Sequence, residues 1–208
     1  EQLERAYLGT AEALAAALEA KDAMLGESSS IVAWCEAVGQ RLGMDEPALR
    51  DLRYGAALHD IGKIAVPQAI LDKPGPLDPA ERAVMERHPL VGEQILAPVE
   101  FLTGVASLIR HEHERWDGTG YPDGLAADGI PLGARIILAC DAYCAMTQDR
   151  PYRGALSDDA AREELRANAG TQFDQQVVDA LLAVLGQSES GATESAPSSA
   201  GRSTSSRE

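Results

Sequence analysis

Apolar residues recur at the spacing of an α-helix over long stretches of this chain of 208 residues. Alanine and leucine are abundant in these stretches, whereas aromatic residues make up only 4% of the chain. Because Ala and Leu favour helices, and a period of 3.6 residues places apolar side chains on one helical face, the pattern predicts an all-α domain of about seven to nine helices. The expected helices span residues 2–25, 31–42, 47–58, 79–88, 90–96, 101–113, 134–146, 158–167 and 175–185.

Capping residues mark the starts of several of these helices. Asp45 precedes a proline in a first helical turn, which is the usual order of an N-cap and its N1 proline. Asp78 is followed by a proline and, three residues later, by Glu81, the pattern of a capping box. The same capping role is expected for Ser28 to Ser30, Ser157 and Asp174.

Two segments lack the helical pattern. Residues 114–133 are rich in Gly, Pro and Asp but also hold Trp116 and Tyr121. Loops of this length in a compact domain are usually functional or disordered, and the aromatics favour an ordered loop that faces a ligand. The Ser-rich composition of residues 187–208 predicts a disordered tail after a domain at 1–186. We interpret 1–25 as the continuation of a connector helix from an upstream domain.

The charge and the cysteines limit the class of protein. A net charge of −15 argues against non-specific binding to nucleic acid or to an anionic membrane, and a small anionic ligand would need local cations or a metal. No apolar stretch approaches the roughly 18 residues of a membrane span. Cys35, Cys140 and Cys144 lack CxxC spacing, so we expect reduced core thiols and a reducing, cytoplasmic location.

His59 and Asp60 stand side by side at the end of the run 47–58. Neighbouring residues on a helix point about 100° apart, so both side chains can reach one point beyond the helix end. Lys63 follows three residues after Asp60 and shares its face. A lone His-Asp pair is more often a surface pair, so the interpretation depends on further ligand-type residues downstream.

Such residues follow at His88, His113 and Asp141. Asp141 lies in the apolar run 134–146, and a carboxylate there must be paired, hydrogen-bonded or bound to a metal. A single histidine is more often structural, but all four histidines of this chain fall near expected helix ends. Histidines with a bridging carboxylate suit a two-metal site for first-row ions such as Fe or Mn.

Several segments together resemble the HD-GYP domain in order and spacing. His59-Asp60-Ile61-Gly62-Lys63 is similar to the HD motif, and the stretch from Trp116 to Pro122 is similar to the GYP loop. The resemblance covers roughly residues 1–186 and implies an all-α fold of the HD superfamily. It implies a metal-dependent phosphodiesterase of bacterial second-messenger signalling that hydrolyses cyclic di-GMP to linear pGpG, GMP or both. The remaining matches are Lys73-Pro74-Gly75, His88-Pro89, Asp141-Ala142 and Asp149-Arg150-Pro151-Tyr152-Arg153.

The resemblance also implies a role for each matching residue. Asp60 would bridge two divalent metals, His59 and Asp141 would hold one, and His88 and His113 would hold the other. Lys63 would contact the scissile phosphate. The residues implied in substrate binding are Lys73, Gly118, Gly120, Tyr121, Arg150 and Arg153.

Two positions depart from the family pattern. Glu27 and Glu112 stand where the family has histidines. On a continuous helix, His111 and His113 would point about 200° apart, so His111 could replace the lost ligand beside His113 only if the helix unwinds there. Glutamate ligands favour harder ions such as Mn²⁺ or Mg²⁺, and two added negative charges would slow hydrolysis of an anionic phosphodiester.

Three functions therefore stay open. The first is an active cyclic di-GMP phosphodiesterase. The second is a degenerate domain, weak or inactive as an enzyme, that binds the nucleotide or a protein. The third, which the intact GYP loop disfavours, is an HD phosphohydrolase for another nucleotide. The resemblance also implies contact with a diguanylate cyclase (GGDEF) domain, and the connector helix favours a homodimer.

Overall fold

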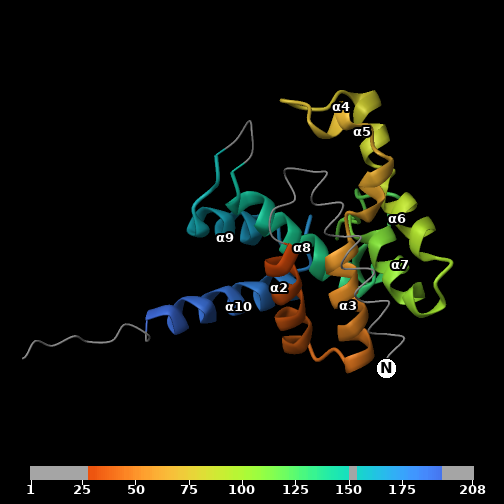
Figure 1. The fold of residues 1–208 in the computed structure, drawn as a ribbon. Helices are drawn as coiled ribbons and strands as arrows, with labels where there is room; N and C mark the ends of the chain where they lie inside the picture. Colours follow the sequence, from red (N-terminus) through yellow and green to blue (C-terminus); the bar gives the residue numbers. More distant parts are fainter. Residues whose placement is uncertain (1–27, 150–153, 194–208) are drawn as a thin grey trace, which may run out of the picture.

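Helices make up almost all of the regular structure in residues 28–149 and 154–193, the parts of the chain that the computed structural model describes. No strand occurs among these residues, apart from one isolated bridge between Ala169 and Phe173. The predicted all-α class is therefore confirmed (Figure 1). The elements are α2 Ser28–Arg41, α3 Glu46–Leu58, η1 Ile61–Ala65, α4 Gln68–Leu71, α5 Pro79–Met85, α6 His88–Leu96, η2 Glu100–Leu102, α7 Thr103–His111, η3 Ala127–Gly129, α8 Leu132–Thr147, α9 Asp158–Ala167 and α10 Gln175–Thr193.

The larger core surrounds α8, the most apolar helix in sequence. This helix contacts α2, α3, α7, α9 and α10, and its buried side chains include Ile136, Ile137 and Cys140. Figure 1 shows α9 and α10 on one side of α2 and α8, with α6 and α7 beyond α3 on the other side. A helix buried on several faces needs few polar positions, which explains why Asp141 is conspicuous within α8.

A second, smaller core lies between α6, α7 and the end of α3. Leu58, Ile61, Leu96, Val105 and Ile109 are among its buried members. Helix α7 belongs to both cores, because Leu108 on its other face packs into the larger one. The two cores therefore meet along α3 and α7.

The capping role predicted for Ser28 to Ser30 was wrong, because α2 already begins at Ser28 and includes all three serines. The other four predicted caps are confirmed. The Asp45 carboxylate accepts a hydrogen bond from the backbone N–H of Ala48 at 3.0 Å. Asp78 and Glu81 form the full capping box at the start of α5. Before the last two helices, the side chains of Ser157 and Asp174 accept hydrogen bonds from the backbone N–H groups of Ala160 and Gln176.

Some predicted helix ends were wrong. Helix α5 ends at Met85, and His88 begins α6 instead of ending the previous helix. Proline is tolerated in a first helical turn, so Pro89 allows the helix to start just before it. Helix α10 continues to Thr193, past the predicted end at 185 and into the predicted tail. Extending a formed helix orders only one residue per added hydrogen bond, so a packed helix can propagate into polar sequence.

Other predictions fall partly or wholly outside the described residues. These are the helix at 2–25, the rest of the predicted tail from 194 onward, Glu27, Arg150 and Arg153. Within the described residues, no helix combines the length and apolar character that a membrane crossing requires. Cys35, Cys140 and Cys144 are buried free thiols, as predicted, and burial raises the pKa of Cys35 well above its usual value.

Candidate metal centre

The close approach of η1 to α6 brings the first candidate ligands together. Helix α3 ends at Leu58, and His59 and Asp60 lead directly into η1. A Cβ atom on Gly62 would lie 1.9 Å from the carbonyl oxygen of His88 and 2.7 Å from the backbone nitrogen of Gly92. Because any other residue would clash with this backbone, Gly62 allows η1 to lie directly against α6 and places Asp60 beside His88.

Hydrogen bonds to the backbone orient two histidine rings. The Nδ1 atoms of His59 and His88 each lie 2.8 Å from a carbonyl oxygen, that of Ala56 and of Met85 respectively. A carbonyl only accepts, so Nδ1 carries the proton in both rings and Nε2 keeps a free lone pair. Both Nε2 atoms therefore face the site as potential metal ligands, in the arrangement that metal-binding histidines use.

Asp60 lies between these two histidines. Its Oδ2 atom is 3.5 Å from Nε2 of His59, and its Oδ1 atom is 3.8 Å from Nε2 of His88. Lys63 donates a hydrogen bond of 2.7 Å to Oδ2. Burial disfavours the charged carboxylate, but Lys63 and the two histidines outweigh it and hold the pKa of Asp60 well below its usual value. Each oxygen thus faces a different histidine, as a bridging ligand requires.

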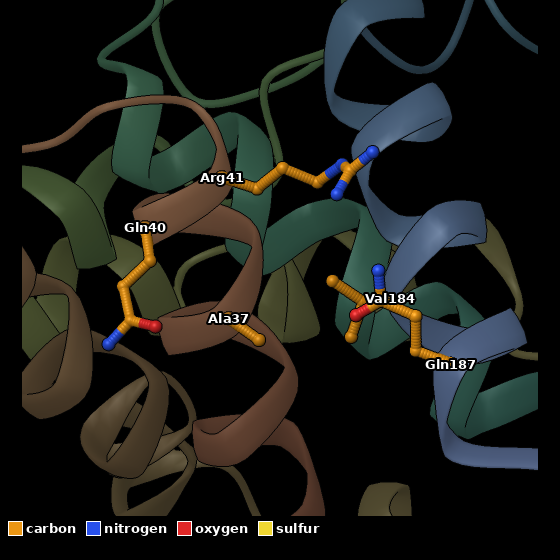
Figure 2. A pocket seen from close by; sticks show the side chains of 5 residues that line it. All are labelled: Ala37, Gln40, Arg41, Val184 and Gln187. Atoms are coloured by element: carbon orange, nitrogen blue, oxygen red, sulfur yellow. The ribbon is translucent and has the colours of Figure 1, made fainter. Parts of the chain in front are cut away.

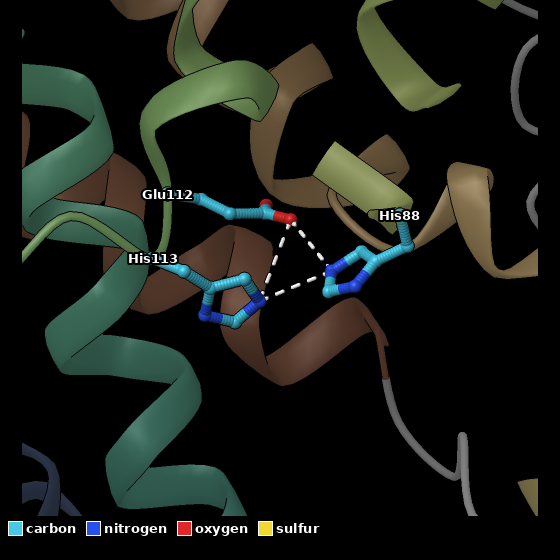
Figure 3. Close-up of side chains that lie close together, drawn as sticks. All are labelled: His88, Glu112 and His113. Carbon is cyan, nitrogen blue, oxygen red and sulfur yellow. Dashed lines mark hydrogen bonds and ion pairs between the residues drawn. The ribbon is translucent and has the colours of Figure 1, made fainter. Parts of the chain in front are cut away.

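A second group of donors gathers around His88. Its Nε2 atom lies 3.1 Å from Nε2 of His113 and 3.3 Å from Oε1 of Glu112 (Figure 3). Oε1 of Glu112 is 3.7 Å from Nε2 of His113. One donor atom from each of the three residues lies within 4.8 Å of the other two. Figure 3 shows His88, from the start of α6, meeting the neighbouring residues Glu112 and His113, which directly follow α7.

The charges of this group fit a divalent cation. Both carboxylate oxygens of Glu112 are buried without a hydrogen-bond donor, and burial beside Asp60 and Asp141 raises its pKa well above its usual value. Burial and the neighbouring His88 lower the pKa of His113 to about 3. Burial also lowers the pKa of His88. Neutral imidazoles around an unpartnered carboxylate are the donors that a divalent first-row metal uses, so these residues fit a metal ion.

Asp141 approaches the site from α8. Its Oδ1 atom lies 3.8 Å from Nε2 of His59, and its side chain is 34% exposed. The structure thus brings Asp141 together with His59 and Asp60. Since Asp60 also faces His88, the predicted ligands His59, Asp60, Asp141, His88, Glu112 and His113 form one continuous constellation.

The loop over residues 114–126 covers His113. The Tyr121 ring stacks on the His113 ring with 5.0 Å between centroids. A Cβ atom on Gly120 would lie 2.3 Å from the backbone nitrogen of Arg115, so this glycine permits close packing of the loop on its own first residues. Gly118 has a positive φ of 77°. The loop is ordered, as predicted, and the reason for Gly120 lies in this internal contact.

Lys73 and His111 make contacts away from the six ligands. Lys73 forms an ion pair with Glu81 of the α5 capping box. His111 donates a hydrogen bond from Nδ1 to the Ser107 carbonyl oxygen, and its Nε2 atom lies 3.1 Å from a carboxylate oxygen of Asp123. This agrees with the expectation that His111 and His113 face different ways.

The sequence interpretation missed Glu114. Its side chain is only 1% exposed, and it accepts hydrogen bonds from three backbone N–H groups of the loop. Its position directly after the candidate ligand His113 could have indicated a role in the site. Only the tertiary structure reveals that the Glu114 side chain is buried under the loop.

A separate open groove of about 600 Å³ lies between α2 and α10 (Figure 2). Its lining contains none of the candidate ligands, so the groove and the metal centre are distinct places. The lining residues are Ala37, Gln40, Arg41, Val184 and Gln187.

Comparison with protein families places this geometry in a known group. The family model described as "HD domain" matches residues 12–177. The chain belongs to the HD domain family. One solved structure of similar fold is described as an HDG"Y"P protein from Bdellovibrio bacteriovorus.

Two curated relatives of this HD domain are named as phosphodiesterases. One is the cyclic di-GMP phosphodiesterase response regulator RpfG of Xanthomonas campestris pv. campestris, 45% identical over 70% of this chain and 39% of the relative. The other is the 3'3'-cGAMP-specific phosphodiesterase 2 of Vibrio cholerae, 36% identical over 81% of this chain and 33% of the relative. The chain thus spans two fifths or less of their length.

The Bdellovibrio structure supports the fold. It superposes with a TM-score of 0.63 at 22% identity, over 76% of this chain and 51% of that chain. At this identity the likeness concerns the arrangement of helices, not the chemistry of the site.

Proposed function

We propose that this domain is a metal-dependent phosphodiesterase that hydrolyses cyclic di-GMP to linear pGpG, GMP or both. The observation that carries the proposal is the position of Asp60, whose two oxygens face Nε2 atoms of two different histidines. A carboxylate between two sets of nitrogen and oxygen donors suits a two-metal site for phosphodiester hydrolysis. The names of the two curated relatives point to cyclic dinucleotides as the substrate class.

The ligands divide into two sets that share Asp60. His59 and Asp141 would hold one ion, and His88, Glu112 and His113 would hold the other, with Fe or Mn as the expected metals. The carboxylates favour harder ions, so Mn²⁺ is the first metal to test. When bound, the two ions would lower the pKa of the attacking water and neutralise charge on the phosphate. We include Glu27 as a further proposed ligand by resemblance.

The surrounding side chains would orient the substrate. Lys63 already lies 2.7 Å from Asp60, so its ammonium group is held at the edge of the site where a phosphate oxygen would arrive. Its positive charge would bind the scissile phosphate and stabilise the charge that develops there. We propose further contacts to the nucleotide from Lys73, Gly118, Gly120, Tyr121, Arg150 and Arg153.

The second candidate is a domain that binds the nucleotide or a protein without turnover. The observation in its favour is Glu112, a buried carboxylate in the position of a family histidine. Each extra anionic ligand makes a metal a weaker Lewis acid and repels an anionic substrate. A partner for such a domain would be a diguanylate cyclase (GGDEF) domain, and we further propose a homodimer and a cytoplasmic location.

The test is hydrolysis by the purified domain loaded with Mn²⁺ or Fe²⁺, with metal content determined on the same sample. Cyclic di-GMP and 3'3'-cGAMP are supplied in parallel, since relatives with both names exist. We expect turnover of cyclic di-GMP that disappears in Asp60→Ala. Asp128→Ala, which changes a side chain that is 91% exposed, is the matched control and should retain activity.

Two other outcomes would change the conclusion. Turnover of only 3'3'-cGAMP would change the substrate but keep the reaction. No turnover, with less than one metal per chain, would exclude the enzyme. Saturable binding of cyclic di-GMP in the presence of a chelator would then support the second candidate, and a Glu27→His, Glu112→His double variant would be tested for recovered activity.

A further inference from the structure

The rings of His113 and its partner His88 are held in different ways. His88 is fixed by a hydrogen bond from Nδ1 to a carbonyl of the preceding turn. Among the described residues, no carbonyl accepts a hydrogen bond from Nδ1 of His113. Its ring instead lies against Tyr121, with 24° between the ring planes. The orientation of His113 therefore depends on where the loop places Tyr121, together with the contact between its Nε2 atom and that of His88.

Glu114 determines the path of that loop. Its Oε1 atom accepts hydrogen bonds from the backbone N–H groups of Asp123 and Gly124, at 2.7 and 3.1 Å. Its Oε2 atom accepts one from Leu125 at 3.0 Å. The positive φ of 68° at Gly124 helps three consecutive N–H groups to face one carboxylate, in the manner of an anion-binding nest.

The same fold-back brings Tyr121 to the histidine. The N–H of Tyr121 lies 3.3 Å from the carbonyl oxygen of His113, and Gly120 permits the two backbone segments to touch. The loop that follows His113 thus folds back so that Tyr121 stacks on the His113 ring, and the Glu114 carboxylate fixes the backbone of residues 123–125. Glu114 is almost fully buried, so its three charge-assisted hydrogen bonds are shielded from water.

We infer that Glu114 is a positioning residue for the second half of the metal centre: by holding residues 123–125, it presses Tyr121 against His113 and aims Nε2 of His113 at the metal position. The inference rests on the proposed function in so far as it assigns a metal to His88, Glu112 and His113. Both carboxylate oxygens of Glu114 accept hydrogen bonds from backbone N–H groups of the loop, so Glu114 is not one of the proposed metal ligands.

The test is the affinity of the chelator-treated protein for Mn²⁺ alone, in the wild type, Glu114→Gln, Tyr121→Leu and the double variant. Glutamine keeps the size of the side chain but turns an amide donor toward the N–H groups of the loop. We expect each single change to weaken the binding of one Mn²⁺ by about 10- to 100-fold, the usual range for residues that orient metal ligands. Both changes act through the orientation of the His113 ring. The double variant should therefore have the same Mn²⁺ affinity as whichever single variant binds Mn²⁺ more weakly.

A matched control lies in the same loop. The Asp117 side chain accepts hydrogen bonds from Thr119 and Arg115. The backbone N–H groups of residues 116 and 117 bond to residues 171 and 172 in the α9–α10 connection. Asp117→Asn should leave Mn²⁺ affinity within about twofold of the wild type, since it does not reach the Tyr121–His113 stack.

A second readout needs no metal. The chain has four histidines, so their ring resonances can be resolved by NMR in the presence of a chelator. Glu114→Gln and Tyr121→Leu should both move the His113 signal, by loss of the ring current of Tyr121, and leave that of His59 in place. This readout remains informative if Glu114→Gln proves too unstable, because Tyr121→Leu alone removes the stack.

The outcomes separate the two proposals. Unchanged Mn²⁺ affinity and an unchanged His113 signal in Glu114→Gln would overturn the inference, as would full additivity of the two changes. A wild type that binds no Mn²⁺ but whose His113 signal moves in Glu114→Gln would support the positioning role and contradict the proposed function.

Discussion

The two halves of the candidate metal centre, the His59 side and the His113 side, differ in how their charges are balanced. On the His59 side, Asp60 is paired with Lys63 and flanked by two histidines, so its carboxylate is satisfied without any ion. On the His113 side, Glu112 is buried with neither oxygen hydrogen-bonded. The buried carboxylate of the His59 side is therefore neutralised by protein groups alone. The Glu112 carboxylate of the His113 side needs a cation or a proton to be stable.

The largest test of this comparison removes one histidine from each half. We expect His59→Ala and His113→Ala each to lower metal content from two ions to one per chain, and to lower turnover by about 10³-fold, as expected when several kcal/mol of charge stabilisation are lost. Metal analysis on the assayed samples provides the measurement. Loss of both ions in both variants would show that the halves load only together.

Replacing Glu112 tests the unsatisfied half directly. With a chelator present, Glu112→Gln should raise the free energy of unfolding by about 1–3 kcal/mol, because it removes a buried, unpaired carboxylate. The folded-state pKa of Glu112 is raised, so the gain should be absent below pH 4, where the carboxyl is protonated in both states, and should grow as the pH rises.

Urea unfolding from pH 4 to pH 8 gives the profile of this gain. In Mn²⁺ the order should reverse, with the wild type more stable than Glu112→Gln, since a ligand bound to the folded state stabilises it. A variant that is less stable than the wild type in chelator would argue that Glu112 has a donor after all.

Replacing Lys63 tests the satisfied half. Lys63→Gln should lower the free energy of unfolding by about 2 kcal/mol at pH 7, because it leaves Asp60 buried without its cation. The pKa of Asp60 is depressed in the folded state, so the stabilisation is fully present above the unfolded pKa of about 3.9 and is lost as the pH falls further. The difference between the two proteins should thus be constant from pH 5 to 8 and shrink below pH 4. A difference that grows in acid would contradict this assignment.

The smallest effect on stability is expected from replacing Arg110, which connects the loop to α6 at the protein surface. Arg110 joins Glu93 and Asp123, and all three side chains are partly exposed. Arg110→Ala should lower the stability by less than about 1 kcal/mol, which corresponds to a fall in Tm of under about 4 °C. Calorimetry measures it, and Mn²⁺ affinity should hardly change. If Arg110→Ala lowered the Mn²⁺ affinity as much as Glu114→Gln, the surface ion pairs of Arg110, and not Glu114, would position the loop.

Local signals in the sequence predicted most of the helices and all of the described ligands as candidates. The N-cap at Asp45 and the capping box at Asp78 involve side chains only three residues from their partners, so sequence alone contains the interaction. Features that depend on distant segments were not predicted. The contact of Gly62 with α6 and the inward turn of Glu114 require the tertiary fold.

The same distinction explains the errors at helix ends. One helix was predicted to end at residue 88 because a proline restricts the residue before it, but the packing of α6 on η1 makes His88 the first residue of the next helix. The substrate-binding role that the family resemblance implies for Lys73 stays a prediction. In the structure Lys73 pairs with Glu81, a contact that the local sequence also permits.

The meeting of two cores has a mechanical consequence. Asp141 belongs to a helix of the larger core, and His88 to a helix that borders the smaller one, while Asp60 lies at the junction of η1 and α3. Ions shared by these ligands would add a cross-link between the two cores, which already meet along α3 and α7. Metal binding would then restrain α6 and α7 relative to the rest of the domain. Amide hydrogen exchange should slow more in α6 than in α10, which lies far from the proposed ligands.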